Sequence, residues 1–142
     1  MVPFSLARVF EPGPEPVPGG LEMSAETRAY LSQVQEICRA HDREIAAAGE
    51  VPVARIVRSE TGVTSRIASL TVPAEAREIR RHLVAARRRM DQTTIWVYRV
   101  MSRSEDPERA YRKKVLPVLQ RRSAHMYETF GSYGVRCNTD AG

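Results

Sequence analysis

Apolar residues recur at steps of three and four along most of the chain, the spacing of one face of an α-helix. The first stripe predicts a helix over residues 25–48, capped by Ser24 and ended by Gly49. The members of this stripe are Tyr30, Val34, Ile37, Cys38, His41 and Ile45. With one apolar face only, this helix requires other helices to pack against.

The longest stripe predicts a helix that enters at Pro73 and continues to Arg103. Its members are Ala76, Ile79, Leu83, Ala86, Met90, Val97 and Met101, at steps of 3, 4, 3, 4, 7 and 4. This heptad-like spacing is typical of antiparallel helical bundles.

A third stripe predicts a helix from Pro107, capped by Asp106, to Gly131. Its members are Tyr111, Val115, Val118, Leu119, Met126 and Phe130. Pro117 lies inside this helix, where its missing N–H and its ring predict a kink.

Residues 50–72 allow two interpretations. They fit two short strands around Glu60-Thr61-Gly62, or a short helix broken near Gly62 that completes the bundle. Apolar residues at three- and four-residue steps on each side of the break favour the helix. The predicted fold is therefore an all-α antiparallel bundle of three long helices plus a short helical or irregular fourth element.

The start of the chain has a different composition. Residues 12–20 read PGPEPVPGG, which predicts an extended, disordered leader over residues 1–23. The bundle is expected over residues 24–137 and a disordered tail over 138–142. Alternatively Met23 is the true start, and the net charge then rises from +5 to +7, because Arg8, Glu11, Glu15 and Glu22 are lost.

Composition narrows the class of protein. The 142 residues are 42% hydrophobic and carry a net charge of +5, with 20 Arg against 2 Lys. No run approaches the roughly 18 apolar residues of a membrane-spanning helix. Two cysteines exclude a disulfide-dense mini-domain, and the composition excludes a collagen-like repeat.

The arginine excess gathers on the second predicted helix. On a helical wheel, Arg77, Arg81 and Arg88 lie opposite the apolar stripe, Arg80 and Arg87 flank it, and Arg89 lies on the other flank. This cationic face predicts an anionic surface or polymer as partner: nucleic-acid phosphate, lipid headgroups or an acidic cell-envelope polymer. The alternative is a solvated face without a partner, which Glu75, Glu78 and Asp91 neutralise in part.

The segment TTIWVYRVM (residues 93–101) is apolar around nearly its whole circumference. Its pattern fits a β-strand as well as a helix, and the continuous stripe from Met90 to Met101 favours the helix. Ile95, Trp96 and Tyr98 then need a cover. That cover is another part of the chain, a second subunit in a homodimer, or a ligand.

Little in the sequence indicates chemistry. His41 lies on the first apolar stripe and is best explained as a buried residue that hydrogen-bonds. His82 with Glu78, and His125 with Glu128, have helical spacing but point away from the core, so no metal or cofactor is predicted. No nucleophile motif, phosphate-binding loop or inward carboxylate pair is present, which argues against an enzyme.

The cysteines also leave two interpretations open. Cys38 lies on the first apolar stripe and Cys137 lies six residues after Gly131. A bridge between them would attach the C-terminal tail to the first helix. The alternative is two reduced thiols.

Three motifs together carry a family resemblance. They are YLSQVQEICRAHDREIAA (residues 30–47), with Ile37-Cys38; LTVPAEAREIRRHL (residues 70–83); and the end Gly134-Val135-Arg136-Cys137. Across residues 28–138 the chain resembles a family of small, uncharacterised secreted proteins and lipoproteins from actinobacteria. The resemblance implies a helical bundle outside the cytoplasm with a Cys38–Cys137 disulfide, and it implies no known activity. The chain departs from the family in showing no signal peptide or lipobox cysteine near its start: either the export signal was lost or removed, or this member stays in the cytosol.

The sequence therefore predicts a non-enzymatic cell-envelope or secreted bundle that binds a partner. The alternative is a cytosolic bundle that binds nucleic acid or protein through the arginine face. An enzyme with a pocket near Trp96 and His41 is a third hypothesis.

Overall fold

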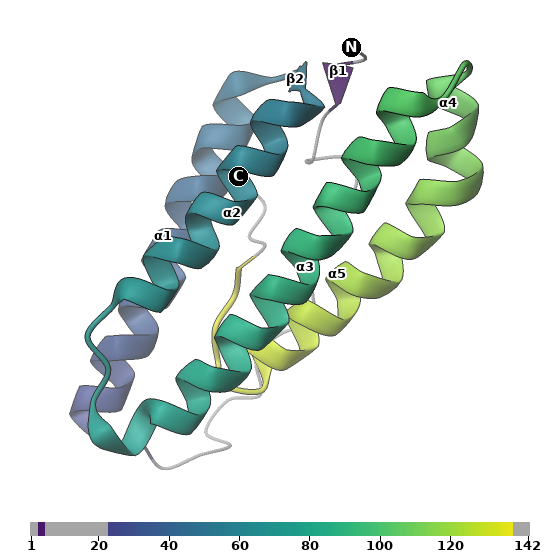
Figure 1. Cartoon of the computed structure of the whole chain (residues 1–142). Helices are drawn as coiled ribbons and strands as arrows, with labels where there is room; N and C mark the ends of the chain where they lie inside the picture. Colours follow the sequence, from purple (N-terminus) through teal and green to yellow (C-terminus); the bar gives the residue numbers. More distant parts are fainter. Residues whose placement is uncertain (1–2, 5–22, 138–142) are drawn as a thin grey trace.

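The computed structural model describes residues 3–4 and 23–137, which form an all-α fold with one pair of very short strands. The long helices lie side by side with roughly parallel axes (Figure 1). They are α1 (Ala25–Ala48), α2 (Val53–Ser69), α3 (Arg77–Arg103) and α5 (Leu116–Gly131). Strand β1 (Pro3–Phe4) pairs antiparallel with β2 (Val51–Pro52). The other residues of the predicted leader up to residue 22, and the predicted tail 138–142, lie outside the described residues.

Neighbouring helices run in opposite directions. Arg80 contacts Ala68, and Arg87, two turns further along α3, contacts Glu60, two turns earlier on α2. Figure 1 shows the same opposite course for α3 and α5, which are joined at one end by the short α4 (Pro107–Ala110). An all-α bundle is therefore confirmed, with α3 in contact with both α2 and α5.

The three predicted apolar stripes form the core. Their buried members are Tyr30, Val34, Cys38, Ala76, Leu83, Ala86, Met90, Val97, Met101, Val115, Leu119, Met126 and Phe130, and α2 adds Ile56, Val63 and Ile67. Burying each large aliphatic side chain stabilises the fold by about 1.5–3 kcal/mol relative to leaving it exposed. The apolar spacing therefore determines which face of each helix points inward.

Helix α1 begins and ends where the sequence predicts. The Ser24 side chain accepts a hydrogen bond from the Thr27 backbone N–H at 3.1 Å. Gly49 follows the helix with φ of 66°, a backbone conformation that side chains with a Cβ disfavour. Both termini of α1 are thus determined locally.

The strand interpretation of residues 50–72 is wrong, and so is the break at Gly62. Helix α2 is continuous through Gly62, which lies in its middle. A glycine inside a helix costs about 1 kcal/mol relative to alanine. Burial of Ile56, Val63 and Ile67 on either side of it outweighs that cost. In this segment β2, two residues long, is the only strand.

The long helix α3 also runs through the TTIWVYRVM segment, which confirms the helical interpretation. It is entered through a short 3₁₀ turn, Ala74–Ala76, that follows Pro73. The β-branched and aromatic residues of this segment prefer strands. Packing of Val97 and Met101 in the core outweighs that preference.

The third predicted helix is not one uniform helix. It consists of α4, a π-helical turn η3 (Tyr111–Val115) and α5. In that turn the Leu116 N–H donates to the Tyr111 carbonyl, five residues back. The wider turn directly precedes Pro117, whose ring would clash with the Lys113 carbonyl in a regular α-helix. The sequence predicts a kink at Pro117, and the structure has a π turn directly before it.

A disulfide joins Cys38 to Cys137, which are 99 positions apart in sequence, with a Cα–Cα distance of 4.8 Å. The Arg136 backbone N–H donates to the Gln35 side chain at 3.1 Å, and Val135 is buried. The C-terminal tail is thus attached to α1 covalently, by a hydrogen bond and by packing.

Candidate functional site

Helix α3 distributes its arginines over two environments. At about 100° per residue, Arg77, Arg81 and Arg88 fall within one narrow sector opposite the core, and all three are exposed. Arg80 is half-buried and Arg87 is buried. The predicted set Arg77, Arg80, Arg81, Arg87 and Arg88 is therefore divided by the structure.

Four of these five arginines line one groove of about 630 Å³. Its lining residues are Val72, Arg77, Glu78, Arg80, Arg81, Val84, Ala85 and Arg88. One carboxylate thus faces four guanidinium groups, and the apolar side chains between them provide surface for the carbon skeleton of a ligand. Such a groove favours an anion, because several positive charges with low-dielectric walls concentrate the field.

Arg80 is fixed in place by the end of α2. Its Nη2 donates to the Ala68 carbonyl at 2.6 Å, in the last turn of α2, where carbonyls lack helical partners. Its Nε is buried without a hydrogen-bond partner among the described residues. Burial raises the pKa of the Tyr30 hydroxyl, and the positive charge of Arg80 offsets part of that rise. Arg80 therefore supplies an immobile charge at the wall of the groove.

The other three groove arginines are exposed and are held by fewer contacts than Arg80. Arg81 pairs with Glu78 at 2.8 Å, but both side chains are about 70% exposed (71% and 69%). Exposed pairs of this kind contribute only about 0–1 kcal/mol, so a ligand anion can displace the carboxylate. Arg77 and Arg88 make no ion pair or hydrogen bond to another described side chain. These guanidinium groups can turn toward a ligand.

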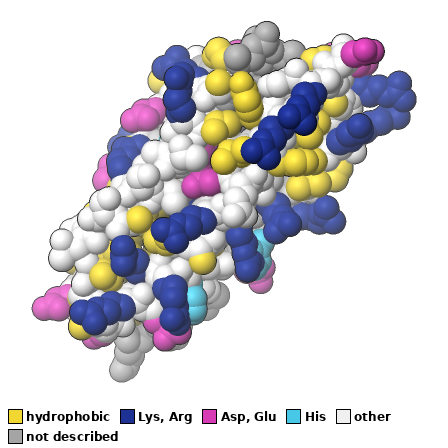
Figure 2. Space-filling view, viewed as in Figure 1, with side chains coloured by type: hydrophobic (Ala, Val, Ile, Leu, Met, Phe, Trp, Pro, Cys, Tyr) yellow, Lys and Arg dark blue, Asp and Glu magenta, His cyan; other side chains and the backbone are white. Residues whose placement is uncertain are grey.

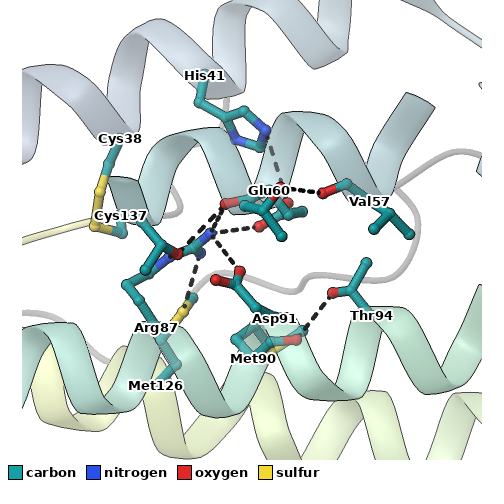
Figure 3. Close-up of polar contacts among 12 residues, drawn as sticks. Cys38, His41, Val57, Glu60, Arg87, Met90, Asp91, Thr94, Met126 and Cys137 are labelled. Atoms are coloured by element: carbon teal, nitrogen blue, oxygen red, sulfur yellow. Dashed lines mark hydrogen bonds and ion pairs between the residues drawn. A yellow bond between two sulfur atoms is a disulfide. The ribbon is translucent and has the colours of Figure 1, made fainter. Parts of the chain in front are cut away.

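Arg87 does not belong to the anion-binding face, so that prediction is wrong. It is 4% exposed and points into the bundle, toward Glu60 (Figure 3). Its Nη2 donates to a Glu60 carboxylate oxygen at 2.7 Å and to the Glu60 carbonyl at 2.8 Å. Nε donates to Thr64 at 3.3 Å, and Nη1 contacts Met126 Sδ at 3.4 Å. Every nitrogen of the guanidinium group is thus engaged inside the protein.

Two further titratable groups adjoin this buried pair. His41 Nε2 lies 3.7 Å from a Glu60 oxygen and has no hydrogen-bond partner among the described residues. Burial lowers the pKa of His41, with a smaller opposing effect from Glu60. Asp91 Oδ1 lies 3.6 Å from Arg87 Nη2, and burial raises the pKa of its carboxyl. His41 is therefore neutral near pH 7, and of its two ring nitrogens Nε2 makes no hydrogen bond with a described residue.

Sequence reasoning missed Glu60, although a signal was available. Glu60 lies at helical steps from Ile56, Val63 and Ile67, so it occupies the buried face of α2. A carboxylate on an apolar stripe requires a cation opposite, and Arg87 flanks the corresponding stripe of α3. Which of the arginines meets Glu60 depends on the register of α2 against α3.

The predicted interface residues Ile95, Trp96 and Tyr98 are all half-buried. Trp96 and Tyr98 pack against the core while keeping part of their rings exposed. The described part of the chain therefore covers Ile95, Trp96 and Tyr98 only in part.

The two His–Glu pairs with helical spacing, His82 with Glu78 and His125 with Glu128, lie on the surface. His82 Nε2 is 3.9 Å from Glu78, and its Nδ1 lies 2.6 Å from the Tyr133 hydroxyl. Over residues 3–4 and 23–137, no three His, Cys, Asp or Glu side chains gather as metal ligands. None of the helices in that part of the chain is both long and apolar enough to cross a membrane.

Comparison with known proteins adds no assignment: no family model, no curated protein and no solved structure matches this chain.

Proposed function

We propose that this protein is a non-enzymatic binding module of the cell envelope or the secreted space, and that its partner is anionic. The groove of α3 carries the proposal. It combines one fixed guanidinium, Arg80, with three exposed ones, Arg77, Arg81 and Arg88, around a partly apolar surface. Guanidinium groups form strong charge-assisted hydrogen bonds with phosphate and carboxylate, often two at a time.

The Cys38–Cys137 disulfide supports a location outside the cytoplasm. Disulfides persist in oxidising compartments and are rare where thiols are kept reduced. Membership of the actinobacterial family of secreted proteins is consistent with this location and is part of the same proposal. Protein isolated from its own cells under thiol-blocking conditions should have the mass of the bridged form, and two blocked thiols would contradict the location.

Binding to long-chain inorganic polyphosphate tests the anionic partner. Affinity should fall steeply with added salt, because counterions are released when arginines neutralise phosphates. The triple variant Arg77→Ala, Arg81→Ala, Arg88→Ala should lose about tenfold or more in affinity at low salt.

The matched control removes three arginines from α1 instead, Arg28, Arg39 and Arg43, which are all exposed. It has the same net charge as the first variant. An equal loss in both variants would show that net charge, rather than the groove, governs binding, and would contradict the proposal. Tighter binding to duplex DNA than to polyphosphate would favour the nucleic-acid alternative.

A further inference from the structure

The C-terminal half of α3 presents one aromatic side chain, Trp96, on the same surface as cationic side chains. Ile95, Trp96, Tyr98 and Val100 are half-buried, whereas Arg99 and Arg103 are exposed. Figure 2 shows hydrophobic side chains on both sides of Lys or Arg side chains in the upper part of the molecule, where Figure 1 places this half of α3. Ile95, Trp96 and Val100 therefore lie beside Arg99 and Arg103 on this surface, whereas Tyr98, about 160° from Trp96, lies on the side of α3 that faces α2.

Trp96 lies at the seam between α3 and α5. Arg89 and His125 approach to 3.4 Å across this seam. Trp96 is two turns beyond Arg89 on α3, and Val118 is two turns before His125 on the antiparallel α5, so the two residues lie at the same level. Val118 is also half-buried. An apolar strip thus follows the seam at this end of the bundle.

Basic residues border this strip. Arg99 and Arg103 lie three and seven residues after Trp96 on α3, and Lys114 lies one turn before Val118. All three are exposed, and none makes an ion pair or hydrogen bond with another described residue. The acidic residues nearest in sequence, Glu105, Asp106 and Glu108, follow the end of α3.

The basic border continues the charged face of the groove. Arg99 lies in the same sector of α3 as Arg81 and Arg88, and Arg103 is rotated about 40° further, toward Trp96. From Arg77 to Arg103, at about 1.5 Å per residue, this face is about 40 Å long. A small anion would occupy only a fraction of it, whereas an extended anionic surface could contact its full length.

We propose that the outer face of α3 docks on an anionic lipid bilayer surface, with Trp96 and the strip around it entering the interfacial layer. This rests on the proposed function, since the groove arginines supply part of the same charge. Amphipathic rings with arginine and lysine around them are suited to the boundary between headgroups and acyl chains. A second copy of the chain is disfavoured as occupant, because a symmetric contact would bring these arginines together.

The test uses Trp96 itself, which is the sole tryptophan of the chain. Vesicles of equimolar phosphatidylglycerol and phosphatidylcholine should shift its emission to shorter wavelength, and vesicles of phosphatidylcholine alone should not. Added salt should reverse the shift. The variant Arg99→Ala, Arg103→Ala should reduce vesicle binding about thirtyfold, from about fivefold for each basic residue near an anionic surface.

The control variant Arg28→Ala, Arg39→Ala loses the same charge from α1 and should bind vesicles more tightly than the α3 variant. Sedimentation with vesicles measures both. Val100 is half-buried and lies one turn after Trp96 on α3, so Val100→Ala removes apolar surface beside the tryptophan and should weaken the emission shift. Equal binding by both arginine variants would contradict the proposal that the outer face of α3 is the one that docks on the bilayer. Vesicle binding without any change in Trp96 emission would show that the apolar strip does not enter the interfacial layer, and would overturn that part of the proposal.

Polyphosphate separates this inference from the proposed function. Binding to polyphosphate without binding to anionic vesicles would overturn bilayer docking and leave the anionic groove supported. Failure to bind either would overturn both. A concentration-dependent shift in Trp96 emission without vesicles, together with dimerisation, would assign the face to a second copy and overturn the lipid surface as occupant.

Discussion

Arg87 and Arg88 are neighbours on the same helix, yet their environments are opposite. Arg87 is 4% exposed and directs all its nitrogens at groups inside the bundle, whereas Arg88 is exposed and lines the groove. One residue along a helix is a rotation of about 100°, which is enough to move a side chain from the core boundary to solvent. An arginine-rich helix can therefore carry both buried structural arginines and exposed groove arginines, which composition cannot separate.

The strongest test of this difference is to remove the buried guanidinium. Arg87→Met should lower the free energy of unfolding by about 3–5 kcal/mol, because the Glu60 carboxylate would remain buried without its partner. Urea denaturation followed by circular dichroism measures the loss. The double variant Glu60→Leu, Arg87→Met should recover most of it, since both charges are then gone. A double variant as unstable as the single one would show that the pair itself stabilises the fold.

Removing the disulfide tests whether the stability of the bundle also depends on a covalent link between α1 and the C-terminal tail. Replacing both Cys38 and Cys137 by serine should lower the free energy of unfolding by about 2–5 kcal/mol, because the long loop between them is no longer closed in the unfolded chain. Thermal unfolding under non-reducing conditions measures the change. Polyphosphate binding should be unchanged in the folded variant, because the groove residues are on α3 and adjoining segments. Wild-type stability after the double substitution would contradict the expectation.

The pH dependence of stability probes the buried cluster with a smaller effect. Burial lowers the pKa of His41 below its usual 6.5, so below that pH the unfolded chain takes up a proton that the folded protein resists. Stability should therefore fall as the pH drops below about 6.5, until the folded pKa is reached. The charged groups that act on His41 are Glu60, Arg87, Glu44 and Arg66.

The His41→Gln variant isolates this contribution. Its stability should fall less between pH 7.5 and pH 5 than that of the wild-type protein, in urea titrations at each pH. Asp91 acts in the opposite direction, because a raised pKa makes the folded protein bind its proton more readily as the pH falls. It is present in both proteins, so the difference between their pH profiles reports His41. Identical profiles would contradict the lowered pKa.

The smallest expected effect on stability belongs to the exposed arginine of the comparison. Arg88→Met should change the free energy of unfolding by no more than about 0.5 kcal/mol, because its side chain makes no ion pair with a described residue. It should nevertheless weaken polyphosphate binding. The urea titration used for Arg87→Met also measures the free energy of unfolding of Arg88→Met. A loss of stability as large as that of Arg87→Met would contradict the difference between a buried structural arginine and an exposed one.

Much of the fold was predictable because it depends on local spacing. The stripe from Tyr30 to His41 predicts the buried face of α1, and Ser24 and Gly49 predict its termini. The path through Gly62 was not predictable, because a glycine weakens a helix locally while packing of α2 against α3 stabilises it from a distance. The π turn before Pro117 likewise depends on α5 keeping its apolar face on the core while the proline ring is accommodated.

By itself, then, the sequence determined that the chain forms helices, which face of most of them is apolar, and that arginines accumulate on one of them. It also left the Cys38–Cys137 bridge as one of two alternatives. Only the tertiary structure decided that the bridge forms, that Arg87 meets Glu60, and that Arg77, Arg80, Arg81 and Arg88 share one groove. The reason is physical. Periodicity along one helix specifies on which face each side chain lies. The partner that a side chain meets on another helix depends on the register between the two helices, which the packing of the whole core sets.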